Sequence, residues 1–242
     1  MQEARCALVI DDDGASLGEI ALRILRLGID VFYAKDPDEA RLLAQQEATR
    51  IRVVLSAATV DPEEVARIRH ALHSLEPGIP RTLVAIGRRP DDERRKSLQE
   101  AGVDWALWEP YDESALRSVL SSAIAARPET TQRKQARLPT MLLARAFVGA
   151  RRHDAIVATL SEAGAFLETP SPIPEGALMT LEISLPDGTL QVKARVVNAR
   201  YPSGDAPAYL PTGMGVEFTV IALDVEERLR RYLREIEKRF LV

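Results

Sequence analysis

The sequence predicts two domains: an α/β domain on a parallel sheet, and a smaller all-β barrel that ends in a helix. The chain has 242 residues, enough for two small domains. In residues 1–126, short apolar runs alternate with segments of helical periodicity. In residues 138–242, strand-like runs separated by turn signals are followed by one amphipathic helix.

The first part contains five short apolar runs that predict strands. A helical pattern follows each run; the first stops at Gly28, and the third starts at Asp61, a predicted N-cap with Pro62 in the first turn. Five such units predict a five-stranded parallel, doubly wound (flavodoxin-like) sheet, with ligand chemistry at the carboxyl ends of its strands. The expected strands are residues 6–10, 30–34, 51–56, 81–86 and 105–108.

The second part begins with a linker rich in basic residues, predicted at residues 127–137. Six short strands then predict a small antiparallel barrel, and the sequence PDG at residues 186–188 predicts a hairpin turn. Asp224 is predicted to cap the last helix, whose apolar stripe packs on the barrel or contacts a partner. The expected strands are residues 141–148, 154–160, 164–169, 178–185, 189–200 and 214–221.

Composition and charge exclude several classes of protein. No run approaches 18 apolar residues, so no membrane span is expected, and the first residues lack the pattern of a signal peptide. We therefore expect a cytoplasmic protein. The net charge of −4 divides into −6 for residues 1–126 and +2 for the rest, which suits a local anion site better than a broad nucleic-acid surface. His70 and His73 lie one helical turn apart without an evident third ligand, so neither a metal centre nor an enzyme is expected.

Residues 6–126 resemble the receiver domain of two-component response regulators. ALVIDDD (7–13) is similar to the first strand and acidic cluster of that family, and GVDWALWEPYDESAL (102–116) is similar to the segment after its fourth helix. The resemblance implies phosphoryl transfer from a histidine to an aspartate. That reaction uses metal-holding acids, the acceptor aspartate, a hydroxyl residue and a lysine.

Only the first of these four features is present in this sequence. Asp11 and Asp12 occupy the positions of the metal-holding acids, but Ser56 occupies that of the acceptor aspartate. Gly87 replaces the hydroxyl residue and Glu109 the lysine. We therefore expect a pseudo-receiver that serves as a docking surface without aspartyl phosphorylation. Asp11 and Asp12 are either a weak divalent-cation site or solvated carboxylates, and Mg²⁺ is not expected as a cofactor.

Residues 133–240 resemble the PilZ domain, a small β-barrel that binds the bacterial second messenger cyclic di-GMP. The first motif of that family, two arginines four residues apart, is matched by Arg133 and Arg137. Its second motif is Asp or Asn, any residue, Ser, two residues and Gly. Here Ser161 and Gly164 match, whereas Thr159 occupies the first position. The segment TGMGVEF (212–218) is similar to a late barrel strand of the family.

The resemblance implies that these five residues bind cyclic di-GMP. The forked guanidinium groups of Arg133 and Arg137 can grip a guanine edge or a phosphate. Ser161 can donate to a phosphate oxygen, and Gly164 would permit a tight turn. At Thr159 the family's charged hydrogen bond is lost, which costs about 1.5–3 kcal/mol, or roughly 10- to 100-fold in affinity.

Two accounts of function remain open. In the first, cyclic di-GMP binds at the linker and barrel, fixes the angle between the domains, and the signal passes to unknown protein effectors. In the second, the site is degenerate and the protein is a ligand-free interaction adaptor. A basic patch contacting nucleic acid is a lesser alternative. The receiver resemblance also leaves a homodimer open, and no catalytic cofactor is expected.

Overall fold

The computed structural model describes residues 6–12, 17–124, 137–202 and 210–240. These residues form two compact units, and the division between residues 132 and 133 falls inside the predicted linker. Each unit has its own hydrophobic core, so each is described separately.

The first unit is built on a five-stranded sheet. Its strands are β1 (Cys6–Ile10), β2 (Asp30–Ala34), β3 (Ile51–Ala57), β4 (Thr82–Gly87) and β5 (Trp105–Trp108). Their order is β2-β1-β3-β4-β5, and all neighbouring strands are parallel. This is the flavodoxin-like order of a doubly wound sheet, so the predicted fold class of this unit is confirmed.

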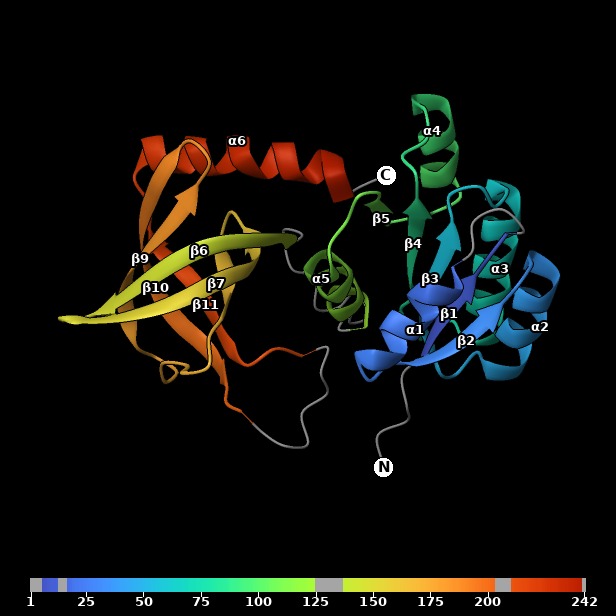
Figure 1. Ribbon diagram of the computed structural model, residues 1–242, viewed down its shortest axis with the longest axis horizontal. Helices are drawn as coiled ribbons and strands as arrows, with labels where there is room; N and C mark the ends of the chain where they lie inside the picture. The colour runs from blue at the N-terminus through green and yellow to red at the C-terminus, as the bar shows by residue number, and fades with distance from the viewer. Residues whose placement is uncertain (1–5, 13–16, 125–136, 203–209, 241–242) are drawn as a thin grey trace. The chain divides into compact units, whose positions relative to one another are not determined.

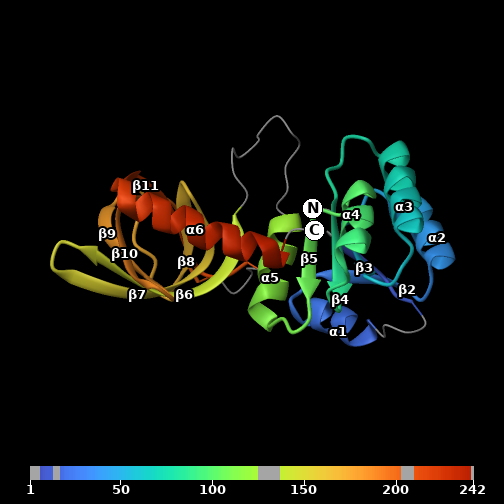
Figure 2. The ribbon, with the colours of Figure 1, turned by 90° about the horizontal axis from the view of Figure 1, so that it is seen from above.

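Five helices cover the two faces of this sheet. They are α1 (Gly18–Arg26), α2 (Pro37–Glu47), α3 (Pro62–Leu75), α4 (Asp92–Glu100) and α5 (Glu113–Ile124). In Figure 2, α1 and α5 lie on one face, and α2, α3 and α4 lie on the other. Because both faces are covered, the central strands β1 and β3 are apolar along almost their whole length.

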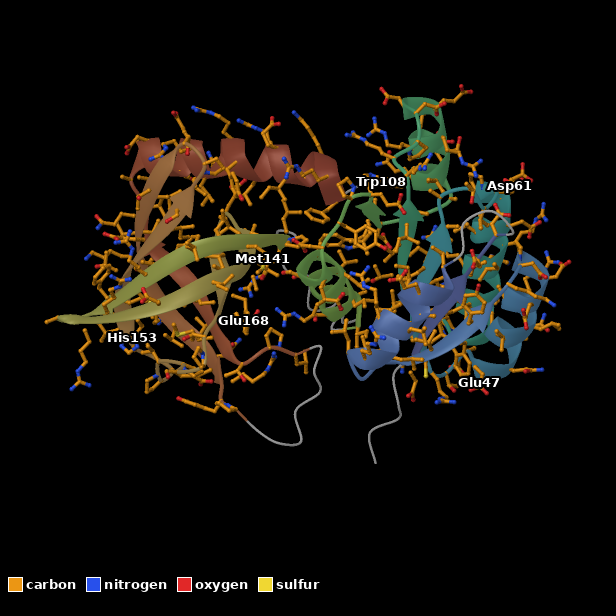
Figure 3. The ribbon with its side chains drawn as sticks, viewed as in Figure 1. Glu47, Asp61, Trp108, Met141, His153 and Glu168 are labelled. Atoms are coloured by element: carbon orange, nitrogen blue, oxygen red, sulfur yellow. The ribbon has the colours of Figure 1, made fainter. Side chains whose placement is uncertain are left out.

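Aspartate side chains cap the starts of α2, α3, α4 and α5 at the carboxyl end of the sheet. The carboxylate of Asp36 accepts the N–H of Glu39, and that of Asp61 accepts the N–H of Glu63 at 3.0 Å. Asp91 caps α4 in the same way. The predicted cap at Asp61 is confirmed, and each cap satisfies a backbone donor that the helix cannot pair internally. Figure 3 shows Asp61 at its helix start.

The second unit is a closed antiparallel barrel, as predicted. Its strands are β6 (Leu138–Val148), β7 (Arg151–Ser161), β8 (Gly164–Glu168), β9 (Leu178–Leu185), β10 (Gly188–Arg200) and β11 (Gly213–Val220). Their order around the barrel is β10-β11-β8-β7-β6-β9. Alternate side chains point inward and form the core, which includes Leu160, Leu167, Leu181, Ile183, Leu190 and Val216.

The chain ends in helix α6 (Leu223–Phe240), which lies along the barrel (Figure 1). Leu229 is fully buried, and the two arginines beside it hold the helix to two different hairpins. The guanidinium of Arg228 pairs with Asp187 in the β9–β10 turn at 3.1 Å, and that of Arg230 pairs with Glu162 in the β7–β8 turn at 3.1 Å. Barrel packing of this apolar stripe is therefore shown for its first half.

The predicted N-cap of this last helix was wrong by two residues. The N–H of Glu226 donates to the carbonyl of Ala222, so the helical pattern starts there, and Asp224 lies inside the first turn. Its carboxylate still suits the positive end of the helix dipole. Among the residues that the structure describes, no helix has both the length and the apolar character needed to cross a membrane.

The docking of α6 gives a stability prediction. Replacing Leu229 with Ala should lower the free energy of unfolding of the barrel by about 2–5 kcal/mol, because it leaves a cavity between helix and barrel. Leu223 on the same helix is 80% exposed, so Leu223→Ala should change that value by less than about 0.5 kcal/mol. Urea denaturation of both variants measures the difference, and equal effects would contradict the packing described.

Candidate functional site

The acid at the end of β1 is satisfied by the protein's own donors. Asp11 is 4% exposed. Its Oδ2 accepts the N–H of Leu17 at 2.7 Å and the hydroxyl of Tyr33, and its Oδ1 accepts the N–H of Asp12 at 2.8 Å. Three donors of the chain therefore satisfy the oxygens of this buried carboxylate.

The hydroxyl of Tyr33 is held as a donor by the same contact. Its hydrogen bond to Asp11, followed by desolvation, raises the pKa of Tyr33 to about 12. Tyr33 therefore stays protonated throughout the physiological range, and its hydrogen bond would weaken only at strongly alkaline pH, as ionisation proceeds through that value.

The positions expected for phosphoryl chemistry lie at this same end of the sheet. Ser56 pairs in register with Ile10 on β1 and Ala85 on β4, and it is only 2% exposed. The carbonyl of Gly87 accepts the N–H of Glu109 at 2.9 Å. A buried alcohol beside apolar neighbours is a poor nucleophile. Within the described ranges, no group of three or more His, Cys, Asp or Glu side chains could hold a metal ion.

The residues predicted to bind cyclic di-GMP meet at one end of the barrel, as far as the structure describes them. Arg137 immediately precedes β6, and Pro139, two residues later, is the cross-strand partner of Thr159 on β7. Ser161 ends β7 and Gly164 begins β8, so both flank the same turn. Arg133, also predicted to bind, lies outside the described residues.

The serine and glycine of the second motif have structural roles in this turn. The hydroxyl of Ser161, which is 5% exposed, donates to the carbonyl of Gly164 at 3.1 Å. A Cβ on Gly164 would lie 2.2 Å from the carbonyl oxygen of Val216 on β11. Glycine is needed here because two backbones approach closely, and not for the freedom of a tight turn that the sequence suggested.

The same turn is tied to the C-terminal helix. Glu162, inside the motif, forms the ion pair with Arg230, whose guanidinium also reaches Glu226 at 2.6 Å. On the other side, the carbonyl of Ala163 accepts the N–H of Phe218 at 2.9 Å. The motif turn is therefore held between α6 and β11, and a displacement of the turn would strain its contacts with both elements.

A row of paired residues crosses the outer face of the barrel from Thr159. Thr159 pairs with Phe166 on β8, Phe166 with Gly215 on β11, and Gly215 with Asn198 on β10. Thr159 and Phe166 are partly exposed between buried neighbours, so their side chains point away from the core. The Oδ1 of Asn198 accepts the N–H of Gly215 at 3.0 Å, which places its amide on the same face.

Phe166 and Arg200 form a flat platform on this outer face. The guanidinium of Arg200 lies 5.7 Å from the ring centre of Phe166, and its Nη1 donates to the carbonyl of Pro211 at 3.2 Å. Aromatic rings and guanidinium planes are surfaces on which nucleic-acid bases stack. Neither residue was predicted from the sequence. An aromatic side chain at an outward position of the strand GAFLE was the available signal for Phe166; only the tertiary structure brings Arg200 to it.

The opposite end of the β6–β7 hairpin is separate from this site. Figure 3 shows Met141 near the start of β6 and His153 near the hairpin tip. Arg152 lies at that tip, where it is exposed and paired with Asp154 at 2.7 Å.

Comparison with known proteins agrees with this geometry. The family model of the PilZ domain matches residues 131–235, the stretch that forms the barrel and most of α6. No curated protein sequence matches the chain at a significant level.

Solved structures resemble each unit separately. The first unit is similar to the chemotaxis protein CheY4 of Vibrio cholerae, at 19% identity over 50% of this chain and 99% of that one, with a TM-score of 0.42. It is also similar to the receiver domain of the sensor histidine kinase PA1611 of Pseudomonas aeruginosa, at 17% identity over 51% and 99% of the two chains, with a TM-score of 0.43. The second unit is similar to the PilZ domain of Escherichia coli YcgR with cyclic di-GMP, at 18% identity over 45% and 93% of the two chains, with a TM-score of 0.37.

The two folds and the family match define the architecture of the chain. The chain joins an α/β domain, with the flavodoxin-like strand order β2-β1-β3-β4-β5, to a closed six-stranded barrel with a C-terminal helix. Residues 131–235 belong to the PilZ domain family.

The role of Gly164 can be separated from ligand binding by a single substitution. Gly164→Ala should lower the free energy of unfolding by at least about 1–3 kcal/mol, because the added Cβ pushes β8 away from β11. Gly78 has no atom within 4 Å of an added Cβ, so Gly78→Ala is the matched control. Urea denaturation without any ligand is the measurement. Wild-type stability in Gly164→Ala would show that this glycine is not required for barrel closure.

Proposed function

We propose that this protein is a bacterial, cytoplasmic signalling protein that binds cyclic di-GMP through its PilZ domain. The signal is relayed by a change between the domains and by contacts with other proteins, without aspartyl phosphorylation and without enzymatic activity. One observation carries the proposal: within a stretch that matches the PilZ family, Arg137, Thr159, Ser161 and Gly164 converge at one end of the barrel.

The outer face beside this end has the chemistry that a guanine dinucleotide needs. Arg137, with Arg133 in the preceding segment, supplies forked cations for phosphates or for a guanine edge. Phe166 and Arg200 offer a stacking platform next to Thr159. The amide of Asn198 lies two strands from Phe166 and can reach the edge of a stacked base.

The relay is supported by where the binding residues lie along the chain. Arg133 and Arg137 belong to the segment that joins the two units, so a ligand bound by these residues would be coupled to both units. On the barrel, Glu162 connects the motif turn to α6 through Arg230. Both routes lead from the ligand to surfaces that a protein effector could contact. The pseudo-receiver, alone or in a homodimer, is one such surface.

A ligand-free adaptor is the second candidate, and two observations favour it. Thr159 lacks the amide or carboxylate that the family places there, and the hydroxyl of Ser161 is buried and donates within its own turn. In this case the PilZ fold would serve only as a scaffold for protein contacts.

Calorimetry with cyclic di-GMP distinguishes the two candidates. We expect the full chain to bind with a dissociation constant below about 10 μM, and Arg137→Ala to weaken binding at least tenfold, because a forked cation is lost. Arg152→Ala removes the same charge at the far end of β7 and should leave binding unchanged. Absence of heat at about 100 μM ligand would favour the adaptor.

Thr159, which differs from the Asp or Asn of the family motif, allows an independent test of ligand binding. Thr159→Asn restores the amide of the family motif and should tighten cyclic di-GMP binding by roughly 10-fold, since a good polar contact contributes about 1.5 kcal/mol. The substitution is on the partly exposed outer face, so the fold should be retained. The same titration measures it. Unchanged affinity in a variant that binds would place the ligand away from Thr159.

A further inference from the structure

A single guanidinium closes the loop that follows the central strand of the first unit. Arg94 on α4 donates from Nη2 to the carbonyls of Thr59 at 3.0 Å and Val60 at 2.6 Å, and from Nε to that of Ala58 at 3.4 Å. These three successive carbonyls form the turn between β3 and α3. Arg94 itself is placed by the first turn of α4, where its N–H donates to the capping carboxylate of Asp91 at 2.8 Å.

Converging carbonyl oxygens are the kind of group that binds a cation. Oxygen ligands of this type suit hard metal ions, and hydrogen bonds from a charged donor to such oxygens are stronger than neutral ones. Arginine keeps its charge at every physiological pH. This cation is therefore always present, whatever the concentration of metal ions around the protein.

The carboxylate of Asp11, on the neighbouring strand end, is also hydrogen-bonded by groups of the chain. Ile10 pairs in register with Ser56, so Asp11 and the carbonyls of the β3–α3 turn follow adjacent strand ends. Tyr33, Leu17 and Asp12 supply the donors to Asp11. The Asp11 carboxylate and the three carbonyls of the turn, which could otherwise attract an ion from solution, are thus paired with groups of the chain.

We propose that Arg94 is a built-in cation that pins the β3–α3 turn to α4, and that with Tyr33 it holds this edge of the first unit in one conformation regardless of divalent ions. This role of Arg94 rests on the proposed function, in which the first unit carries out no phosphoryl transfer. It assigns this unit the role of a fixed module, so that changes in the protein originate in the PilZ domain and the linker.

Hydrogen–deuterium exchange of the full chain tests the role of Arg94. In Arg94→Gln, amide exchange in residues 57–61 should accelerate at least about tenfold, because the turn loses its charged donors. Arg94→Lys keeps the charge but not the fork, so it should give an intermediate rate. Lys96→Gln removes a charge from the same helix, where Lys96 pairs with Glu100 at 3.9 Å, and should match the wild type. Circular dichroism confirms that each variant is folded.

Two results would overturn the proposal. One is exchange in residues 57–61 of Arg94→Gln that stays within about twofold of the wild type. The other is a wild-type protein in which about 10 mM MgCl₂ slows exchange of this turn, because an added cation would then still act there. Neither result depends on cyclic di-GMP, and phosphorylation by acetyl phosphate would count separately against the proposed function.

Discussion

The close approach of β8 to β11 is the constraint on which the proposed ligand face depends. A Cβ on Gly164 would collide with the carbonyl of Val216, and one on Gly213 would collide with that of Leu167, each at 2.2 Å. The two glycines therefore permit contact at both ends of one strand pair. This contact closes the barrel and aligns Thr159, Phe166, Gly215 and Asn198 in a single row. Without it, the stacking platform and the motif turn would not share a surface.

The polar groups at two positions, one in each unit, differ in how they are paired and exposed. At the carboxyl end of the parallel sheet, Asp11 and the carbonyls of the β3–α3 turn are paired internally, by Tyr33 and Arg94 among others. On the barrel, the guanidinium of Arg200 and the ring of Phe166 are stacked, yet partly exposed. A paired acceptor has little to gain from a new ligand, whereas a solvated platform can exchange water for a base. This contrast supports the proposal that the ligand binds to the second unit.

In the proposed relay, helix α6 is the element that is attached to the motif turn. Arg228 and Arg230, on either side of the buried Leu229, attach it to the β9–β10 and β7–β8 hairpins. Each ion pair is exposed and contributes little stability by itself. The arginines instead set the position of the helix relative to the turn that contains Glu162, while buried apolar residues such as Leu229 supply the binding energy.

Local residue patterns were sufficient to predict the two folds and their order along the chain. Apolar runs and turn residues mark strands and helices locally, and the predicted strand and helix positions agree with the structure to within a few residues. The cap expected at Asp224 lies two residues earlier, at Ala222. The motif pattern likewise pointed to Thr159, Ser161 and Gly164. Only the tertiary structure showed that Gly164 is required by a strand distant in sequence, that Arg200 stacks on Phe166, and that Arg94 fills the β3–α3 turn. These contacts join residues far apart along the chain, and their geometry depends on strand register and helix placement, which no local pattern of residues encodes.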